Sequence, residues 1–267
     1  MYTRDQLADH ARALGIRDGD VVMVHASVRA VGPVAGGPDQ IHLALKDAVG
    51  ETGSLLMYAS CPDGYDEVGR DCHPPDVEAE LLEKLPAFDA RTARSARDNG
   101  ALVEMLRTWP GVVANDHVAR FICHGPHADR LFATQPWDLP FGRGSALDHL
   151  VTLGGRILLL GSDHDAVTFL HYAEHIVEVA DKRLVRYQVP VLEDGQRVWR
   201  WCSEFDTSQP AHASWPEDLF RRITDAHLTA TGNAGGRIGD ARSHLIDTEP
   251  LLADGLALMR ALALDPA

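Results

Sequence analysis

The stretch RILLLGSDHDAVTFLHYAEH, residues 156–175, places a short apolar run directly before a segment with helical spacing. Arg156 to Leu160 predicts a buried strand. His171, Glu174 and His175 follow at spacings that put them on one face of a helix. In open α/β folds, ligands bind beyond the carboxyl ends of the strands. The stretch therefore predicts a strand-helix unit with chemically active side chains gathered where the strand ends.

The rest of the chain continues this alternation of strands and helices. Further strands are predicted at Val21 to His25, Ser54 to Tyr58 and Val118 to Cys123, and helices at Arg4 to Leu14, Asp39 to Val49, Pro75 to Leu85, Leu102 to Leu106, Asp165 to Ala180, Pro216 to Thr229 and Leu251 to Leu264. Alternation of this kind is typical of an α/β sheet covered by helices.

Asp194-Gly195 lies between two strand-like runs, Leu184 to Leu192 and Arg197 to Cys202. Asp-Gly in this setting is a strong hairpin signal, and the hairpin interrupts the strand-helix rhythm. We expect an α/β fold with a mixed central sheet flanked by helices and a β-hairpin addition near residues 186–204. The chain has no internal repeat and no low-complexity linker, so residues 1–267 are expected to form a single domain.

The charge balance is acidic, with 39 Asp and Glu against 25 Lys and Arg and a formal net charge of −14. This balance disfavours binding to nucleic-acid phosphate and favours either plain solubility or a cationic ligand. The first twenty residues alternate apolar and charged side chains, with no apolar run that would span a membrane. We expect a cytoplasmic protein with no membrane contact, whose four widely spaced cysteines are reduced thiols.

The segment His171-Tyr-Ala-Glu174-His175 matches HxxEH, the inverted zinc-peptidase signature. In that signature both histidines hold zinc and the glutamate activates water. A site of this kind also needs a third ligand that the sequence does not identify. Alternatively, His171 packs in the core while Glu174 and His175 form a pair on the helix surface.

Two glycine-rich stretches bear on anion binding. Gly142-Arg143-Gly144-Ser145 precedes a predicted helix, so Ser145 either caps that helix or helps present backbone N–H groups to an anion. Gly232 to Gly239 follows a helix, whereas a dinucleotide-binding loop follows a strand, and we interpret it as a turn-rich connection.

Four motifs occur in an order that resembles one known family. They are Val24-His25-Ala26-Ser27-Val28-Arg29-Ala30-Val31-Gly32 with Gly36-Gly37-Pro38 downstream, Asp138-Leu-Pro-Phe141-Gly142-Arg-Gly-Ser145, Leu160-Gly161 with Asp165, Thr168, His171 and Glu174, and Glu204-Phe205-Asp206-Thr207. Together they are similar to the aminoglycoside 3-N-acetyltransferase family, antibiotic acetyltransferases that do not share the common GNAT fold. The resemblance makes a chance HxxEH match the simpler explanation of His175.

The resemblance implies acetyl transfer from acetyl-CoA to the 3-amino group of a polycationic aminoglycoside, by direct attack and without a metal. It implies that His171 is the catalytic base, that Glu204 supports it and that Asp206 helps to bind the antibiotic. Coenzyme A is expected at His25, Ser27, Val28 and Ser145, and further substrate contacts at Asp63, Asp66 and Glu174. An amine near neutral pH must lose a proton before it attacks a thioester, and imidazole titrates in that range. A monomer or homodimer is expected.

The chain departs from the family pattern at two places. Ala96-Arg97-Asp98-Asn99 stands where the family usually has a His-Pro or Asn-Pro dipeptide, and Ala146 replaces a proline after Ser145. These departures leave open the range of antibiotics and an acetyltransferase for a different amine. An HxxEH zinc-dependent hydrolase stays the alternative from another class.

Overall fold

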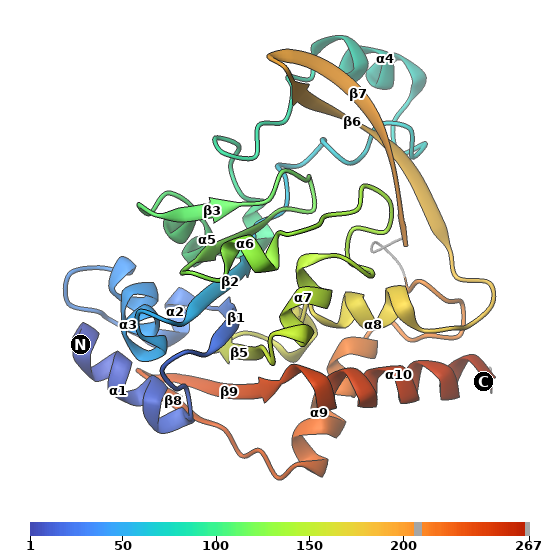
Figure 1. Cartoon of the computed structure of the whole chain (residues 1–267). Helices are drawn as coiled ribbons and strands as arrows, with labels where there is room; N and C mark the ends of the chain where they lie inside the picture. The colour runs from blue at the N-terminus through green and yellow to red at the C-terminus, as the bar shows by residue number, and fades with distance from the viewer. Residues whose placement is uncertain (206–209, 265–267) are drawn as a thin grey trace.

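A seven-stranded mixed sheet forms the centre of the computed structural model, which describes residues 1–205 and 210–264 (Figure 1). Its strand order is β3-β4-β2-β1-β5-β9-β8. β1 (Val21–Ala26) pairs in parallel with β2 (Ser54–Tyr58) on one side and with β5 (Arg156–Leu160) on the other. The carboxyl ends of these three strands therefore meet at one edge of the sheet.

Antiparallel strands extend this parallel centre on both sides. β4 (Phe121–His124) pairs with β2, and β3 (Val112–Ala114) lies outside it. On the other side β9 (Ala241–Asp247) pairs with β5, followed by β8 (Gly236–Ile238). The mixed sheet expected from the sequence is thus confirmed.

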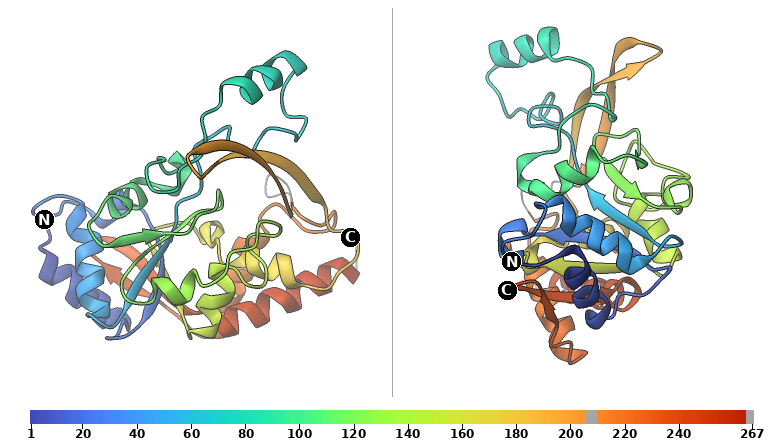
Figure 2. Two further views of the ribbon diagram at one scale, coloured as in Figure 1. Left: turned by 45° about the horizontal axis from the view of Figure 1, so that its top comes forward. Right: turned by 90° about the vertical axis from the view of Figure 1, so that its left-hand side faces the viewer.

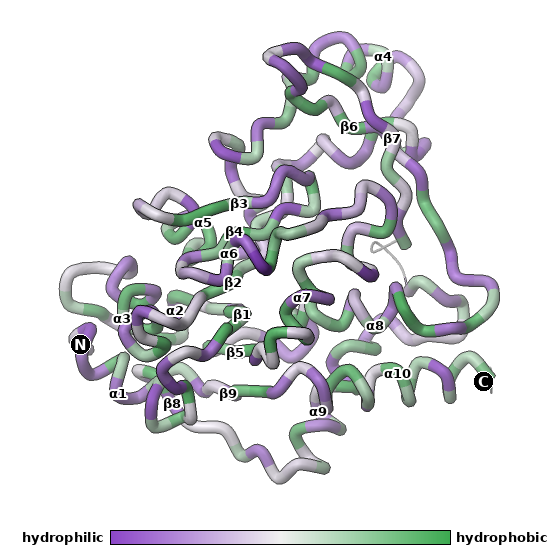
Figure 3. Tube along the Cα trace, in the orientation of Figure 1, coloured by the Kyte–Doolittle hydropathy of each residue, from purple (hydrophilic) through white to green (hydrophobic). Residues whose placement is uncertain are grey.

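Helices cover both faces of the sheet, because the side chains of each strand alternate between two apolar clusters. The face reached by Val22 and Val24 packs against α1 (Arg4–Leu14), α3 (Asp39–Val49) and α5 (Ala101–Arg107), with the short α2 (Val28–Val31) beside them. The opposite face, reached by Val21 and Met23, packs against α6 (Ala128–Leu131), α7 (Ala146–Thr152), α8 (Leu170–Ile176), α9 (Leu219–Ala230) and α10 (Thr248–Leu264). Figure 3 shows hydrophobic residues concentrated along the inner strands.

The predicted hairpin forms from β6 (Leu184–Glu193) and β7 (Gln196–Phe205), which make a separate two-stranded sheet. Its turn residues Asp194 and Gly195 have φ of 48° and 77°, the left-handed values that a tight hairpin turn requires. The hairpin arches away from the central sheet, with α4 (Pro75–Lys84) beside its outer part (Figure 2). The antiparallel strands of the central sheet therefore come from β3, β4, β8 and β9 and not from the hairpin.

A fully buried arginine, Arg120, holds the segment of residues 90–94 against the start of β4. Arg120 donates hydrogen bonds to the backbone carbonyls of Ala90, Ala93 and Arg94, at 2.8–2.9 Å. Its guanidinium also lies over the ring of Phe88, and burial lowers its pKa to about 10. These contacts fix an irregular segment that leads into the site.

Several boundaries differ from the prediction. The helix expected over Asp165 to Ala180 is only α8, because a 3-10 turn (His164–Ala166) ends at Val167 and the chain becomes extended at Val177. The strand expected from Val118 begins at Phe121. Gly232 to Gly239 includes the short strand β8 beside its turns, and β9 was not predicted. Within the described residues, no helix combines the length and apolar character that a membrane span requires.

Candidate active site

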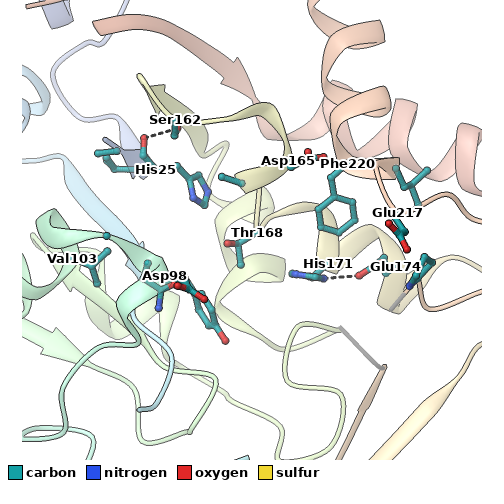
Figure 4. Close-up of a pocket in the computed structure, with 18 of the residues that line it drawn as sticks. His25, Asp98, Val103, Ser162, Asp165, Thr168, His171, Glu174, Glu217 and Phe220 are labelled. Atoms are coloured by element: carbon teal, nitrogen blue, oxygen red, sulfur yellow. Dashed lines mark hydrogen bonds and ion pairs between the residues drawn. The ribbon is translucent and has the colours of Figure 1, made fainter. Parts of the chain in front are cut away.

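A cavity of about 800 Å³ opens at the carboxyl ends of β1, β2 and β5 (Figure 4). β1 and β2 contribute His25 and Tyr58, and the loop after β5 contributes Ser162. Its other polar lining side chains are Asp98, Asn99, Asp165, Thr168, His171, Glu174 and Glu217. The volume lies within the range of small-molecule sites. The cavity lies beyond the end of β5, where the sequence predicts the site.

His171 is held in the cavity wall by three side chains. Its Nδ1 lies 2.5 Å from Oε2 of Glu174, one turn further along α8. Its ring stacks on Phe141 at 5.2 Å between centroids and meets the edge of Phe220 at 4.8 Å. Since Nδ1–H donates to the carboxylate, Nε2 on the other side of the ring is directed into the cavity and can accept a proton (Figure 4). The arrangement is that of a general base with an orienting acid.

The end of α8 is fixed by Lys182. Its ammonium donates to the carbonyls of Glu174, His175 and Val177 at 2.9, 3.2 and 2.8 Å, which satisfies carbonyls that a helix end leaves free. The same ammonium lies 4.3 Å from the ring centroid of Phe205 at the end of β7. Lys182 thereby joins the base of the hairpin to the helix that carries His171.

His175 has a structural environment. Its Nδ1 hydrogen-bonds to the backbone carbonyl of His171 at 2.7 Å, and its ring packs edge-on against Phe141 and Phe205. Burial lowers its pKa to about 3, so it is neutral over the working range of pH. Among the described residues, no three His, Cys, Asp or Glu side chains are grouped to hold a metal ion. The HxxEH zinc alternative is therefore not supported.

A second, smaller cavity of about 230 Å³ shares Tyr58 and His171 with the first. Asp66 and Glu204 contribute carboxylates to it, and Tyr58 and Tyr187 contribute phenols. Burial raises the pKa of Glu204 to about 7, with Asp66 adding to the shift and Arg70 opposing it. Burial also raises the pKa of Asp66. His171 thus lines both a large cavity and a small acidic one.

The structure pairs His171 with a different carboxylate from the one expected, and support of His171 by Glu204 stays a prediction. The hydrogen bond that orients the imidazole comes from Glu174, which the sequence analysis had placed among the substrate contacts. Glu174 is adjacent to His171 on the helix, whereas Glu204 enters the site from the far end of β7. Glu204 still shares a cavity with His171 and is only 5% exposed.

The residues expected to bind coenzyme A lie in different surroundings in the structure. His25 lines the large cavity, and its Nε2 is buried without a partner among the described residues. Ser27 and Val28 form the turn from β1 into α2, where the Ser27 N–H donates to the carbonyl of Leu160 at 2.9 Å. Ser145 is fully buried and accepts a hydrogen bond from the Asp148 N–H as the cap of α7, and its contact with the cofactor stays a prediction.

Of the acidic residues expected to bind substrate, Asp66 lines the small cavity. Asp63 is exposed and lines neither cavity, and Asp206 lies outside the described residues. Sequence reasoning missed Phe220 and Tyr187, which come from α9 and β6 and have no local signal that links them to His171.

Both cavities are lined by acidic side chains. The lining carboxylates are Asp98, Asp165, Glu174 and Glu217 in the large cavity and Asp66 and Glu204 in the small one. Among the described residues that line them there is no Lys or Arg. Carboxylates in a cleft attract cations and form charge-assisted hydrogen bonds with them. The site therefore suits a ligand rich in ammonium groups.

Comparison with known proteins identifies the relatives of this chain. The sequence model of aminoglycoside 3-N-acetyltransferases matches residues 23–260. The chain belongs to this family. Aminoglycoside N(3)-acetyltransferase III of Pseudomonas aeruginosa is 40% identical over 94% of this chain and 90% of its own length. Aminoglycoside N(3)-acetyltransferase VII of Streptomyces paromomycinus is 39% identical over 96% and 91%.

Solved structures of the family agree with this fold. AAC-IIIb with CoASH aligns with a TM-score of 0.90 and 38% identity, covering 97% of each chain. AAC-VIa bound to sisomicin aligns with a TM-score of 0.91 and 34% identity, covering 99% of each chain. The resemblance found in the sequence motifs is therefore confirmed, and so is the α/β fold class.

Proposed function

We propose that this protein transfers the acetyl group of acetyl-CoA to the 3-amino group of an aminoglycoside. The observation that carries the proposal is the His171–Glu174 pair, whose free Nε2 faces a cavity lined by carboxylates. Family membership supports the reaction class, since relatives include one structure with CoASH and another with sisomicin. The acidic lining supports a polycationic acceptor.

The mechanism follows from the geometry of the pair. Glu174 fixes the tautomer of His171, so Nε2 accepts the proton that the amine loses as it attacks the thioester carbon. Glu174 then stabilises the imidazolium that forms. A positioned base contributes about 10²–10⁴ in rate, and holding amine and thioester together supplies roughly 7–11 kcal/mol. Positioning by the two cavities is therefore the larger contribution.

The large cavity is proposed to hold the acetylated end of acetyl-CoA. It reaches from His25 at the end of β1 to His171, and the orphaned Nε2 of His25 is a polar group suited to hydrogen-bond with the donor. Burial lowers the pKa of His25 to about 4, so its imidazole is neutral. A neutral imidazole hydrogen-bonds with an amide or thioester carbonyl without adding a charge.

The departure from the family pattern at Ala96 to Asn99 lies in this site. Arg97–Asn99 forms a 3-10 turn, and Asp98 and Asn99 line the large cavity. Asp98 adds a carboxylate on the wall opposite α8 (Figure 4). We propose that this turn adjusts which amines are accepted.

The first test is thiol release from acetyl-CoA, with and without a panel of aminoglycosides, using wild type and His171→Ala. Turnover that requires an aminoglycoside and falls by about 10²–10⁴ in the variant is expected. NMR of the product is expected to show acetylation at the 3-amino group. A folded His171→Ala protein that binds acetyl-CoA and keeps full turnover would refute the assignment. Turnover with other amines but with no aminoglycoside would show that the acceptor belongs to another class of amine.

We also propose that the protein acts in the cytoplasm, as one domain and as a monomer or homodimer. Its cysteines are free thiols in the structure, which agrees with a reducing compartment. Sedimentation of the purified protein tests the oligomeric state.

A further inference from the structure

Glu204 occupies a position that its predicted role does not explain. Glu174 already orients His171, yet Glu204 is buried at the end of β7 in the small cavity that His171 also lines. Burial removes the hydration that stabilises a carboxylate charge, and a hydrogen bond or a nearby cation offsets this loss only in part. Its position beside the base therefore points to a part in the reaction.

The reaction proposed above requires two proton transfers from the same nitrogen. An aliphatic amine is an ammonium near neutral pH and has no lone pair for attack until its first proton leaves. The second proton leaves as the carbon–nitrogen bond forms. His171 Nε2 is one acceptor and accounts for one of these protons.

We propose that Glu204 accepts the first proton, converting the bound ammonium into the nucleophilic amine, and that His171 accepts the second. The inference rests on the proposed acetyl transfer and assigns a second catalytic residue to it. The two acceptors are placed for this sequence because His171 lines both cavities whereas Glu204 lines only the small one. An amine held in the small cavity faces Glu204 before it meets the donor in the large cavity.

The surroundings of Glu204 suit a reversible proton acceptor. Arg70, Asp66, Tyr187 and His171 influence its ionisation, and the phenol of Tyr187 hydrogen-bonds to the carboxylate. The charge of Glu204 in turn helps to raise the pKa of Tyr58, Cys61 and Cys202. Burial brings the pKa of Glu204 to about 7, much closer to that of an aliphatic ammonium than the pKa of an exposed carboxylate would be. A smaller difference in pKa makes the proton transfer less unfavourable.

The proposed steps balance in atoms and charge. The ammonium gives one proton to the Glu204 carboxylate and becomes a neutral amine. The amine lone pair forms the bond to the thioester carbon while His171 Nε2 takes the second proton. The carbon–sulfur bond then breaks with its electron pair on sulfur, and the thiolate receives that proton from His171. Glu204 releases its proton to solvent, so each turnover yields amide, thiol and one proton.

The test measures kcat against pH, at saturating acetyl-CoA and aminoglycoside, for wild type, Glu204→Gln and Glu204→Asp. The glutamine cannot accept a proton, so the variant turns over only acceptor that binds with its reacting amine already neutral. For an amine with a pKa of about 9, the neutral fraction is about 1% at pH 7 and about 10% at pH 8. The kcat of the variant is therefore expected to rise about tenfold per pH unit up to pH 9, whereas the kcat of wild type levels off above about pH 7, once Glu204 is ionised. Glu204→Asp keeps a carboxylate and is expected to keep a plateau of the wild-type kind.

The matched control is Glu193→Gln, which removes the same charge from the turn end of the hairpin, where the half-buried Glu193 pairs with Arg200. Its kcat profile is expected to follow that of wild type. Parallel profiles for Glu204→Gln and wild type, or a change confined to KM, would overturn the inference and leave Glu204 as a binding residue. If Glu204→Gln does not fold, the kcat profile of Glu204→Asp takes its place. A rise of kcat with pH as steep as that predicted for Glu204→Gln would then overturn the inference. Absence of turnover by wild type with every aminoglycoside would instead reject the proposed function.

Discussion

Replacing Glu204 with glutamine is expected to stabilise the folded protein at alkaline pH while leaving it nearly unchanged in acid. The folded-state pKa of Glu204 is about 7, against 4.5 for an unperturbed glutamate, because burial disfavours the charged carboxylate. A raised pKa means that the folded state holds its proton more tightly than the unfolded state does. The stability that this residue contributes is therefore fully present below pH 4.5 and is lost as the pH rises through about 7.

The size of the effect follows from the difference between the two pKa values. One unit corresponds to about 1.4 kcal/mol, so the full loss is roughly 3 kcal/mol, of which roughly 2.5 kcal/mol falls between pH 5 and pH 8.5. Glutamine has no charge to bury at any pH and keeps this stability. Removing the charge of Glu204 also removes its repulsion with the neighbouring carboxylate of Asp66, which further stabilises the folded variant at alkaline pH. For a chain of this size, the change corresponds to a relative shift in Tm of about 5–10 °C.

Urea unfolding of wild type and Glu204→Gln at pH 5 and pH 8.5, followed by circular dichroism, measures this difference directly. The free energy of unfolding of the variant is expected to exceed that of wild type at pH 8.5 and to approach it at pH 5. Glu193→Gln, at the turn end of the same strand pair, is expected to show no such dependence. A difference between wild type and Glu204→Gln that is the same at both pH values would refute the reasoning, since Glu204 would then titrate as an ordinary glutamate.

Other predictions concern the base, a close backbone approach and the metal. Glu174→Gln is expected to lower kcat by about 10²-fold or more with little change in KM, because Glu174 fixes the tautomer of His171. Steady-state measurement of thiol release gives both constants, and an unchanged kcat would contradict the pairing. Gly161→Ala is expected to lower the free energy of unfolding by about 1–3 kcal/mol more than Gly154→Ala. Both glycines have φ of 63°, but a Cβ atom added at Gly161 would lie 2.5 Å from the Cβ of Ala30, whereas one added at Gly154 would meet no atom within 4 Å. Equal losses in urea unfolding would exclude the clash. Dialysis against EDTA is expected to leave aminoglycoside-dependent turnover intact, and loss of turnover that zinc restores would favour the hydrolase reading.

Sequence reasoning succeeded where one local signal dominated. The central strands at Ser54 to Tyr58 and Arg156 to Leu160 are mostly apolar and each follows a glycine, and the structure gives the same limits. The hairpin was found because Asp194-Gly195 adopts left-handed backbone values that few other residue pairs accept.

The errors arose where tertiary contacts override local pattern. β9 was missed because it carries Ser243 and His244 at buried positions, where an apolar alternation would be expected. The helix at His171 was predicted too long because its end depends on the ammonium of Lys182, which caps several carbonyls from outside the helix. Neither feature is visible in a window of neighbouring residues.

The site shows the same division. The family motifs and the helical spacing predict His171 as a site residue, and the structure places it on α8 in the wall of the large cavity. The partner of its imidazole was assigned to Glu204 although an adjacent carboxylate, Glu174, had the spacing to reach it. The aromatic contacts from Phe141 and Phe220 depend on how distant segments pack and have no counterpart in local sequence.

The separate hairpin has a consequence for how such a protein can diversify. β6 and β7 pair with each other and not with the central sheet, so a change in their length or in the Asp194-Gly195 turn leaves the register of the sheet unaltered. The base of β7 nevertheless supplies Glu204 to the small cavity, while β1 and the loop after β5 supply the walls of the large one. Mutations that remodel the hairpin are therefore expected to change the small cavity, while the strands that line the large cavity remain under separate selection.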